Sequence, residues 1–107
     1  IDLIKFNDSV ALSKVDDFVK KLDKSYNTVV NDGGSRFSGG QIQRISLARA
    51  IYNSKEILIL DEFTNQIDKY SELVIVDNLF NKFKDKTIIT VTHNKEIINL
   101  CREINLD

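Results

Sequence analysis

Residues 38–41, Ser-Gly-Gly-Gln, have the composition of a phosphate-binding turn. They stand just ahead of a stretch with helical apolar spacing and hold two of the four glycines in the chain. The first amides of a helix lack partners within the helix and carry the positive end of its dipole, so they bind anions. Gly39 and Gly40 would let a phosphate approach this backbone, and Ser38 could cap the helix or contact the same phosphate. Taken alone, the triplet is more simply explained as a plain serine cap after a glycine turn.

Two acidic residues follow the next apolar run. Residues 57–60 are Ile-Leu-Ile-Leu, and Asp61 and Glu62 come directly after them. Such a run predicts a strand buried on both faces, as in a parallel sheet, and open α/β sheets bind ligands at the carboxyl ends of their strands. One carboxylate can hold Mg²⁺ partly through water, and the next can orient or deprotonate an attacking water. A solvated strand end is the simpler explanation of the two acids alone, but the hydrophobic strand fixes where they point.

The only histidine, His93, ends a second apolar run, residues 87–92. Neighbouring parallel strands would bring it near Glu62, where it has either a structural role or a contact to a phosphate or water. Asp68 precedes a predicted helix over residues 71–83. Its simpler role is the N-cap of that helix, and a role beside a ligand is compatible with it.

The order of the predicted elements indicates the fold class. We predict helices over 9–22, capped by Asp8 or Ser9, then over 38–52, 71–83 and 95–100, with Leu73, Val76, Phe80 and Phe83 facing inward on the third. An extended piece at 26–30 and a turn at 31–34 join the first two helices. From residue 56 the order is strand, helix, strand, helix, strand, with the last strand at 103–106. This alternation predicts an α/β fold with a parallel sheet and right-handed crossovers. We divide the chain into a helical lobe, residues 1–53, and an α/β part, residues 54–107.

The bulk composition limits the classes of function. The 107 residues are enough for about one small domain. A formal net charge of −1 gives no electrostatic case for binding nucleic acid. The single cysteine cannot form a disulfide within the chain. Because the chain contains no methionine and opens with IDLIKF, we expect it to be a piece of a longer protein.

Taken together, the motifs resemble one family. The segments FSGGQIQRISLARAI, ILILDE, TNQID and TVTHN are similar in order and spacing to the ATP-binding cassette (ABC) ATPases, and the residues leading into the first are similar to exporter-type cassettes. The resemblance covers nearly the whole chain. It implies a partial cassette of the P-loop NTPase type, corresponding to the C-terminal part of such a domain.

The resemblance also implies roles for the residues above. Ser38, Gly39, Gly40 and Gln41 correspond to the signature motif, Asp61 and Glu62 to the Mg²⁺ side and the catalytic carboxylate of Walker B, Asp68 to the D-loop, and His93 to the switch histidine. In the family two cassettes meet head to tail, and the signature of one covers the γ-phosphate of ATP held by the other. The implied cofactors are therefore ATP and Mg²⁺. The implied partners are a second cassette, identical or different, and a transmembrane domain in the same or another chain. The implied location is the cytoplasmic face of the cell (inner) membrane.

Two of the departures from the family pattern bear on activity. Asn65-Gln66-Ile67 stands where Ser-Ala-Leu is usual in the D-loop, and no G-x-x-x-x-G-K-[ST] segment occurs, so the Walker A loop is absent. We therefore expect the parent protein to hydrolyse ATP for export and the 107-residue chain alone to be inactive. Two alternatives remain: a soluble ABC ATPase of DNA repair or translation, and a non-catalytic cassette half that completes a partner's site.

Overall fold

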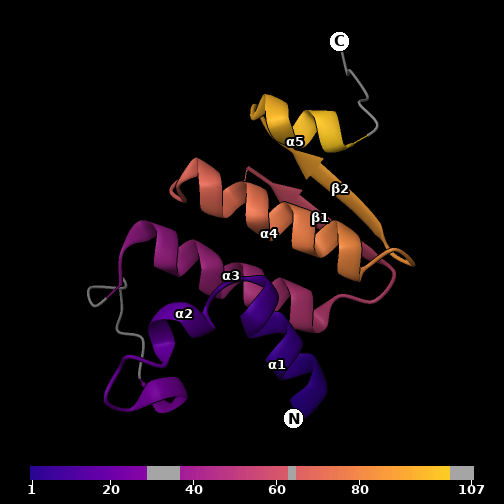
Figure 1. Ribbon diagram of the computed structural model, residues 1–107. Helices are drawn as coiled ribbons and strands as arrows, with labels where there is room; N and C mark the ends of the chain where they lie inside the picture. The colour runs from indigo at the N-terminus through magenta and orange to yellow at the C-terminus, as the bar shows by residue number, and fades with distance from the viewer. Residues whose placement is uncertain (29–36, 63–64, 102–107) are drawn as a thin grey trace.

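The helices begin where polar side chains cap their first turns. The computed structural model describes residues 1–28, 37–62 and 65–101, and Figure 1 shows its helices and strands. Side chains of Asp2, Ser38, Asp68 and Asn94 accept hydrogen bonds from backbone amides at the starts of α1 (Leu3–Leu12), α3 (Gly39–Asn53), α4 (Lys69–Lys82) and α5 (Lys95–Leu100). These contacts satisfy amides that have no partner within the helix. The predicted caps Ser38 and Asp68 are confirmed, and so are the bounds of the 95–100 helix.

The prediction of one helix over residues 9–22 is wrong. Helix α1 begins at Leu3, and it is capped by Asp2 rather than by Asp8 or Ser9. The helical conformation is interrupted at Lys14, whose φ of 61° is in the left-handed region, and the short helix α2 (Asp16–Val19) follows. This break lets three valines, Val10, Val15 and Val19, gather in one buried cluster with Ala48 of α3. The helical spacing of the apolar residues did not reveal this interruption between α1 and α2.

The connector between the first helices also differs from the prediction. Residues 25–27 form a short 3₁₀ helix, η1 (Ser25–Asn27), where an extended piece was expected from residue 26. The ring of Tyr26 meets that of Phe6 edge to face, with centroids 5.1 Å apart. The rest of the predicted extended piece from residue 29, the turn at 31–34 and the last strand at 103–106 lie outside the described residues.

The two described strands pair in parallel, as the order of elements predicts. β1 (Ile57–Asp61) and β2 (Thr87–Val91) are in register from Ile57 opposite Thr87 to Asp61 opposite Val91. Helix α4 forms the crossover between them. The α/β fold class with a parallel sheet is therefore confirmed, and the carboxyl ends of both strands lie at one edge of the sheet.

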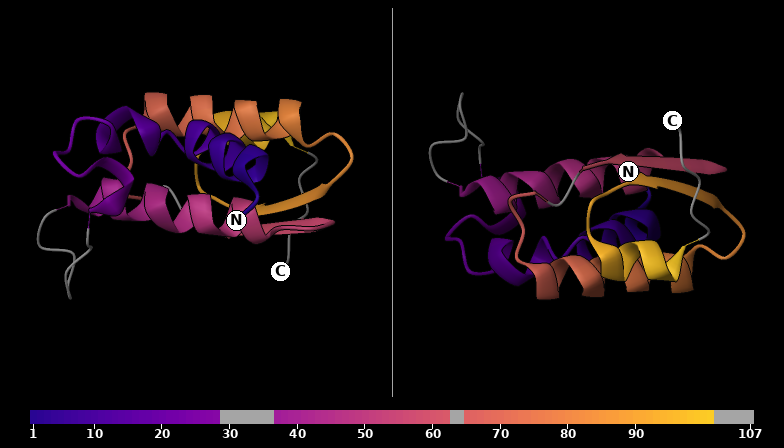
Figure 2. Two further views of the ribbon diagram at one scale, coloured as in Figure 1. Left: turned by 90° about the horizontal axis from the view of Figure 1, so that it is seen from below. Right: turned by 90° about the horizontal axis from the view of Figure 1, so that it is seen from above.

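The described elements form two layers. Figure 2 shows α3 and the sheet in one layer and the helices α1, α2, α4 and α5 in the other. Between the layers lies a buried cluster to which α3, β1 and α4 all contribute: Leu47, Ile51, Leu58, Leu60, Ile67, Ile75 and Leu79. Helix α3 thus shares one buried cluster with β1 and α4, and the division of the chain at residues 53 and 54 stays a prediction. No helix in residues 1–28, 37–62 and 65–101 is both long and apolar enough to cross a membrane.

The strands are not buried on both faces as predicted. In β1, Leu58 is 3% exposed, but Ile59 is 65% exposed. In β2, Ile89 and Val91 are also exposed. The physical reason is that the described helices cover one face of the sheet only (Figure 2).

The inward face of α4 also differs from the prediction. Val76 is fully buried as expected, but Leu73 and Phe80 are only partly covered. Ile75 and Leu79, which lie outside the predicted inward face, are fully buried as well. Glu72 is buried on the same helix. Because α4 has neighbours on several sides, the apolar spacing alone does not identify which face points to the core.

Candidate functional site

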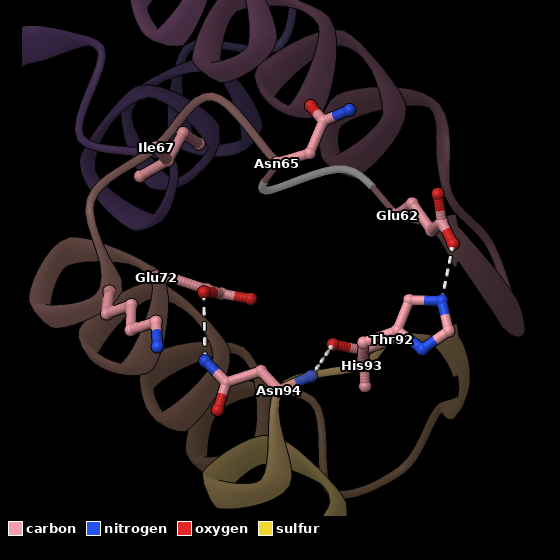
Figure 3. A pocket seen from close by; sticks show the side chains of 8 residues that line it. Glu62, Asn65, Ile67, Glu72, Thr92, His93 and Asn94 are labelled. Atoms are coloured by element: carbon pink, nitrogen blue, oxygen red, sulfur yellow. Dashed lines mark hydrogen bonds and ion pairs between the residues drawn. The ribbon is translucent and has the colours of Figure 1, made fainter.

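Glu62 and His93 meet where the two strands end. Glu62 follows β1, and its backbone amide donates to the carbonyl of Val91 at 2.9 Å, which extends the pairing of the strands by one residue. Its Oε1 lies 3.2 Å from Nε2 of His93, as Figure 3 shows. Both side chains reach solvent: His93 is 94% and Glu62 is 49% exposed. The prediction that parallel strands bring His93 near Glu62 is confirmed.

The backbone at Glu62 separates the two acidic side chains. The φ of Glu62 is 46°, in the left-handed region that residues other than glycine rarely adopt and that costs on the order of 1 kcal/mol. Asp61 belongs to the outward face of β1 and lines a groove with Ile59 and Gln43. Glu62, in contrast, lines a cleft on the side of His93. The structure therefore does not place Asp61 in the cleft of Glu62.

The cleft has a volume of about 360 Å³. Figure 3 shows it between the strand ends, the segment after β1 and the start of α4. Its lining consists of Glu62, Asn65, Ile67, Lys69, Glu72, Thr92, His93 and Asn94. Carboxylate, imidazole, ammonium and amide groups converge here, so the cleft has the groups needed to hold a polar ligand and to move a proton.

A partly buried hydrogen bond holds the segment that carries His93. The side-chain amide of Asn94 donates to Oε2 of Glu72 at 2.9 Å, and the backbone amide of Asn94 donates to Oγ1 of Thr92 at 3.0 Å. Glu72 is only 5% exposed, and a buried carboxylate is stable only when it is hydrogen-bonded. The sequence analysis missed Glu72 and Asn94. An acidic residue at an inward position of a helix was the available signal.

Residues 38–41 form a capping box at the start of α3. The backbone amide of Gln41 donates to Oγ of Ser38, and the backbone amide of Ser38 donates to Oε1 of Gln41, both at 3.1 Å. Each side chain thus satisfies a backbone amide of the other residue. The structure confirms the cap, and the contact of these residues with a phosphate stays a prediction.

Gly39 and Gly40 have a second role that the sequence analysis missed. A Cβ at Gly39 would lie 1.4 Å from Oε1 of Gln66, and a Cβ at Gly40 would lie 2.6 Å from the backbone oxygen of Gln66. Both contacts are too short for a real side chain. The two glycines therefore make room for the segment that follows β1, in addition to any ligand. The same segment is hydrogen-bonded to the side chain of Gln43 in α3, and the sequence analysis also missed this contact.

Asp68 connects this segment to both α4 and α3. Its Oδ2 accepts from the backbone amide of Ser71 at 2.9 Å, and its Oδ1 lies 3.9 Å from Nη2 of Arg44. The pKa of the Asp68 carboxyl is held below its ordinary value mainly by the hydrogen bond from the Ser71 backbone amide. A hydrogen bond with the Ser71 side chain and the charge of Arg44 lower this pKa further by smaller amounts. The folded state therefore favours the ionised form of this carboxyl.

The cap at Asp68 should make stability depend on pH. We expect Asp68→Ala to lower the melting temperature at pH 7. Because the pKa is lower in the folded state, the contribution of Asp68 is complete above its unfolded pKa of about 3.9 and is lost as the pH falls through the folded value. The gap between Asp68→Ala and wild type should therefore shrink below about pH 4. Thermal unfolding followed by circular dichroism from pH 2 to 7 measures this.

Asp68→Asn is the matched control for this experiment. Asparagine also caps helices well but does not titrate. The melting temperature of Asp68→Asn should therefore be close to that of wild type at pH 7, and in acid it should rise relative to that of wild type. A gap between Asp68→Ala and wild type that stays constant down to pH 2 would contradict an ionised cap.

The sequence was compared with known protein families and proteins. Residues 4–65 match the family model described as "ABC transporter". The chain is 37% identical over 106 residues to ABC transporter B family member 29, chloroplastic, of Arabidopsis thaliana, which covers 99% of the chain and 17% of that protein. It is 44% identical over 82 residues to the alpha-hemolysin translocation ATP-binding protein HlyB of Escherichia coli, covering 77% of the chain and 12% of that protein. The chain thus spans less than a fifth of the length of these relatives.

A solved structure agrees with these matches. The structure of a bacterial Atm1-family ABC exporter with ATP bound superposes with a TM-score of 0.80 at 27% sequence identity, over 89% of this chain and 17% of that chain. The family match covers more than half of the sequence and includes α3, β1, Asp61 and Glu62. This chain belongs to the ABC transporter family.

Proposed function

We propose that this chain is the C-terminal portion of an exporter-type nucleotide-binding domain that binds and hydrolyses ATP to drive membrane transport. The observation that carries the proposal is the pair Glu62 and His93 at the ends of two parallel strands, facing a cleft lined mainly by residues with polar side chains. The similarity to HlyB and to an exporter structure solved with ATP supports transport over a soluble ATPase of DNA repair or translation. Residues 1–53 would form the helical lobe, and residues 54–107 would form part of the ATPase core.

The start of α3 would suit a phosphate of ATP, and Asp61, which lies outside the cleft of Glu62 and His93, would offer one ligand to Mg²⁺. The 15-residue helix α3 starts with two glycines behind an exposed serine, so these three residues add no bulky side chain to its first turn; the flexible end of the Gln66 side chain lies against Gly39. An anion is favoured at such a helix end. Asp61 offers one exposed carboxylate at a strand end, and Mg²⁺ in nucleotide sites takes one or two carboxylates beside water and phosphate oxygens. Bound there, the metal would neutralise charge on the phosphates.

Each site residue would then have a distinct task in hydrolysis. Glu62 would orient and polarise the attacking water. His93, whose Nε2 lies 3.2 Å from Oε1 of Glu62, would contact the γ-phosphate. Ser38, Gly39, Gly40 and Gln41 would stabilise the phosphate of a nucleotide held by a second cassette across a head-to-tail interface. Preorganised charge and positioning would supply most of the rate enhancement.

The proposal includes partners and a location. A second cassette, identical or different, would hold on its own Walker A loop the nucleotide that residues 38–41 cover, and a transmembrane domain in the same or another chain would use the energy of hydrolysis. The assembly would lie at the cytoplasmic face of the cell (inner) membrane. The near-neutral net charge of −1 gives no reason to add nucleic acid to these partners.

ATP hydrolysis by the full-length protein tests the proposal. We expect the full-length protein in lipid vesicles to hydrolyse ATP when Mg²⁺ is present and to stop when the metal is chelated. The 107-residue chain alone should show no turnover, because it has no lysine-bearing glycine loop for the β- and γ-phosphates. Phosphate release measured for both proteins, with the same buffer carrying no protein as control, gives the answer.

Two outcomes would contradict the proposal. Turnover by the purified 107-residue chain would show that the Walker A loop is not required. No turnover by the full-length protein would favour the non-catalytic alternative, in which this chain completes the site of a partner cassette. The unusual Asn65-Gln66-Ile67 in the D-loop position is the observation that keeps that alternative in view.

A further inference from the structure

We propose that Gln43 is a positioning residue that fastens residues 65–68, here called the 65–68 loop, to the first turns of α3. Both ends of its side-chain amide are used. Oε1 of Gln43 accepts from the backbone amide of Gln66 at 3.1 Å, and Nε2 donates to Oδ1 of Asn65. The partners are 22 and 23 residues away in the sequence, so these are tertiary contacts. An amide that pairs at both ends fixes both the distance and the orientation of the loop.

Neighbouring contacts attach the same loop to α3 at further points. Next to Gln43, the guanidinium of Arg44 lies 3.9 Å from the carboxylate of Asp68. One turn earlier, Gly40 leaves space for the backbone oxygen of Gln66. The loop is therefore seated along the first two turns of α3 from Gly40 to Arg44, and Gln43 provides the hydrogen bonds at the centre of this contact.

The 65–68 loop lies between the two candidate ligand sites. Asn65 and Ile67 line the cleft that also holds Glu62 and His93. Gln66, between them in sequence, backs onto the glycines of residues 38–41. A residue that fixes this loop on α3 consequently fixes the distance between the helix start and the cleft.

This geometry gives Gln43 a function in the proposed hydrolysis reaction, and the inference rests on that proposed function. The start of α3 would face a nucleotide on a second cassette, while the cleft would act on the nucleotide of its own cassette. Gln43 would keep the start of α3 and the cleft at a fixed position relative to each other. Binding of a second cassette at the start of α3 would then also position the residues that line the cleft. Its hydrogen bonds are exposed and contribute little to stability, so its effect should appear in turnover rather than in folding.

The test uses Gln43→Met in the full-length protein. Methionine keeps the volume and the apolar stem but loses both hydrogen bonds. We expect kcat for ATP to fall about tenfold, because small misplacements at a reaction centre are costly, while KM stays within about twofold. Ser46→Ala, an exposed residue one turn further along α3, is the matched control and should leave kcat unchanged. A kcat for Gln43→Met equal to that of Ser46→Ala would overturn the proposal.

A double-mutant cycle with Asn65→Ala separates direct contact from general damage. Because the two side chains share a hydrogen bond, the losses of Gln43→Met and Asn65→Ala should not add, whereas Ser46→Ala and Asn65→Ala should add. Additive losses in the first pair would contradict a direct role. The exchange rate of the Gln66 backbone amide provides a readout independent of activity, and it should rise in Gln43→Met only.

The outcomes distinguish this inference from the proposed function. If wild type hydrolyses no ATP, the proposed function fails and the catalytic part of this inference fails with it. The amide exchange then still decides whether Gln43 fastens the loop. If wild type is active and Gln43→Met is unchanged in both kcat and exchange, the inference alone is wrong.

Discussion

Replacing Glu62 by glutamine in the full-length protein is expected to reduce ATP turnover by about 10³-fold while ATP stays bound. Loss of a positioned general base typically removes 10²–10⁴-fold of the rate. Glutamine keeps the size of the side chain and a hydrogen-bond acceptor for His93, so the fold and the 3.2 Å contact should survive. Single-turnover phosphate release and equilibrium ATP binding, measured on the same preparation, separate the loss of chemistry from a loss of affinity.

Glu56→Gln is the control for this experiment. Glu56 is an exposed carboxylate at the opposite end of β1, so its replacement removes the same charge far from the cleft. We expect wild-type turnover from this variant. If Glu62→Gln retains turnover within about threefold of wild type, Glu62 is not the general base.

Replacing Gly40 by alanine is expected to lower the free energy of unfolding by about 1–3 kcal/mol, the usual cost of inserting a methyl group into filled space. The new Cβ would lie 2.6 Å from the backbone oxygen of Gln66, so the 65–68 loop must move as a whole. Alanine is the better helix former by about 1 kcal/mol, which offsets part of this cost. Denaturant unfolding of wild type and variant measures the difference.

Gly39→Ala is the matched comparison, because the same residue changes one position earlier. There the new Cβ would meet Oε1 of Gln66, the far end of a flexible side chain that can turn away. We expect a stability within about 0.5 kcal/mol of wild type. Adding Gln66→Ala should relieve any remaining loss at Gly39 but not the loss at Gly40, because the obstructing atom at Gly40 belongs to the backbone. Equal losses at both glycines, or rescue of Gly40→Ala by Gln66→Ala, would contradict the packing described here.

The sequence by itself determined the local elements and the order of the motifs. Ser38 and Asp68 cap their helices because their short oxygen-bearing side chains reach amides three residues away, which is a local interaction. The approach of His93 to Glu62 also followed from the sequence. Parallel pairing of strands joined by one helical crossover brings their carboxyl ends to one edge whatever the details of packing.

Only the tertiary structure decided which faces are covered. Ile57 and Ile59 were predicted to be buried, because a run of branched apolar residues is the same whether one or both faces of the strand are packed. Both are exposed, since the described helices lie on one face of the sheet. The predicted 9–22 helix breaks at Lys14 because valines on both sides of the break gather against α3. Such preferences depend on neighbours that are distant in the sequence.

The tertiary structure also assigned partners that no local pattern contains. Glu72 pairs with Asn94 across 22 residues, and Gln43 pairs with the 65–68 loop across a similar interval. Gly39 and Gly40 were predicted to be small for the sake of a ligand, whereas at Gly40 the backbone oxygen of Gln66 already requires a glycine, and at Gly39 only the flexible end of the Gln66 side chain stands in the way. Amino-acid type and spacing set what a side chain can bind. Only the folded arrangement of α3, β1 and α4 sets which atoms come within reach.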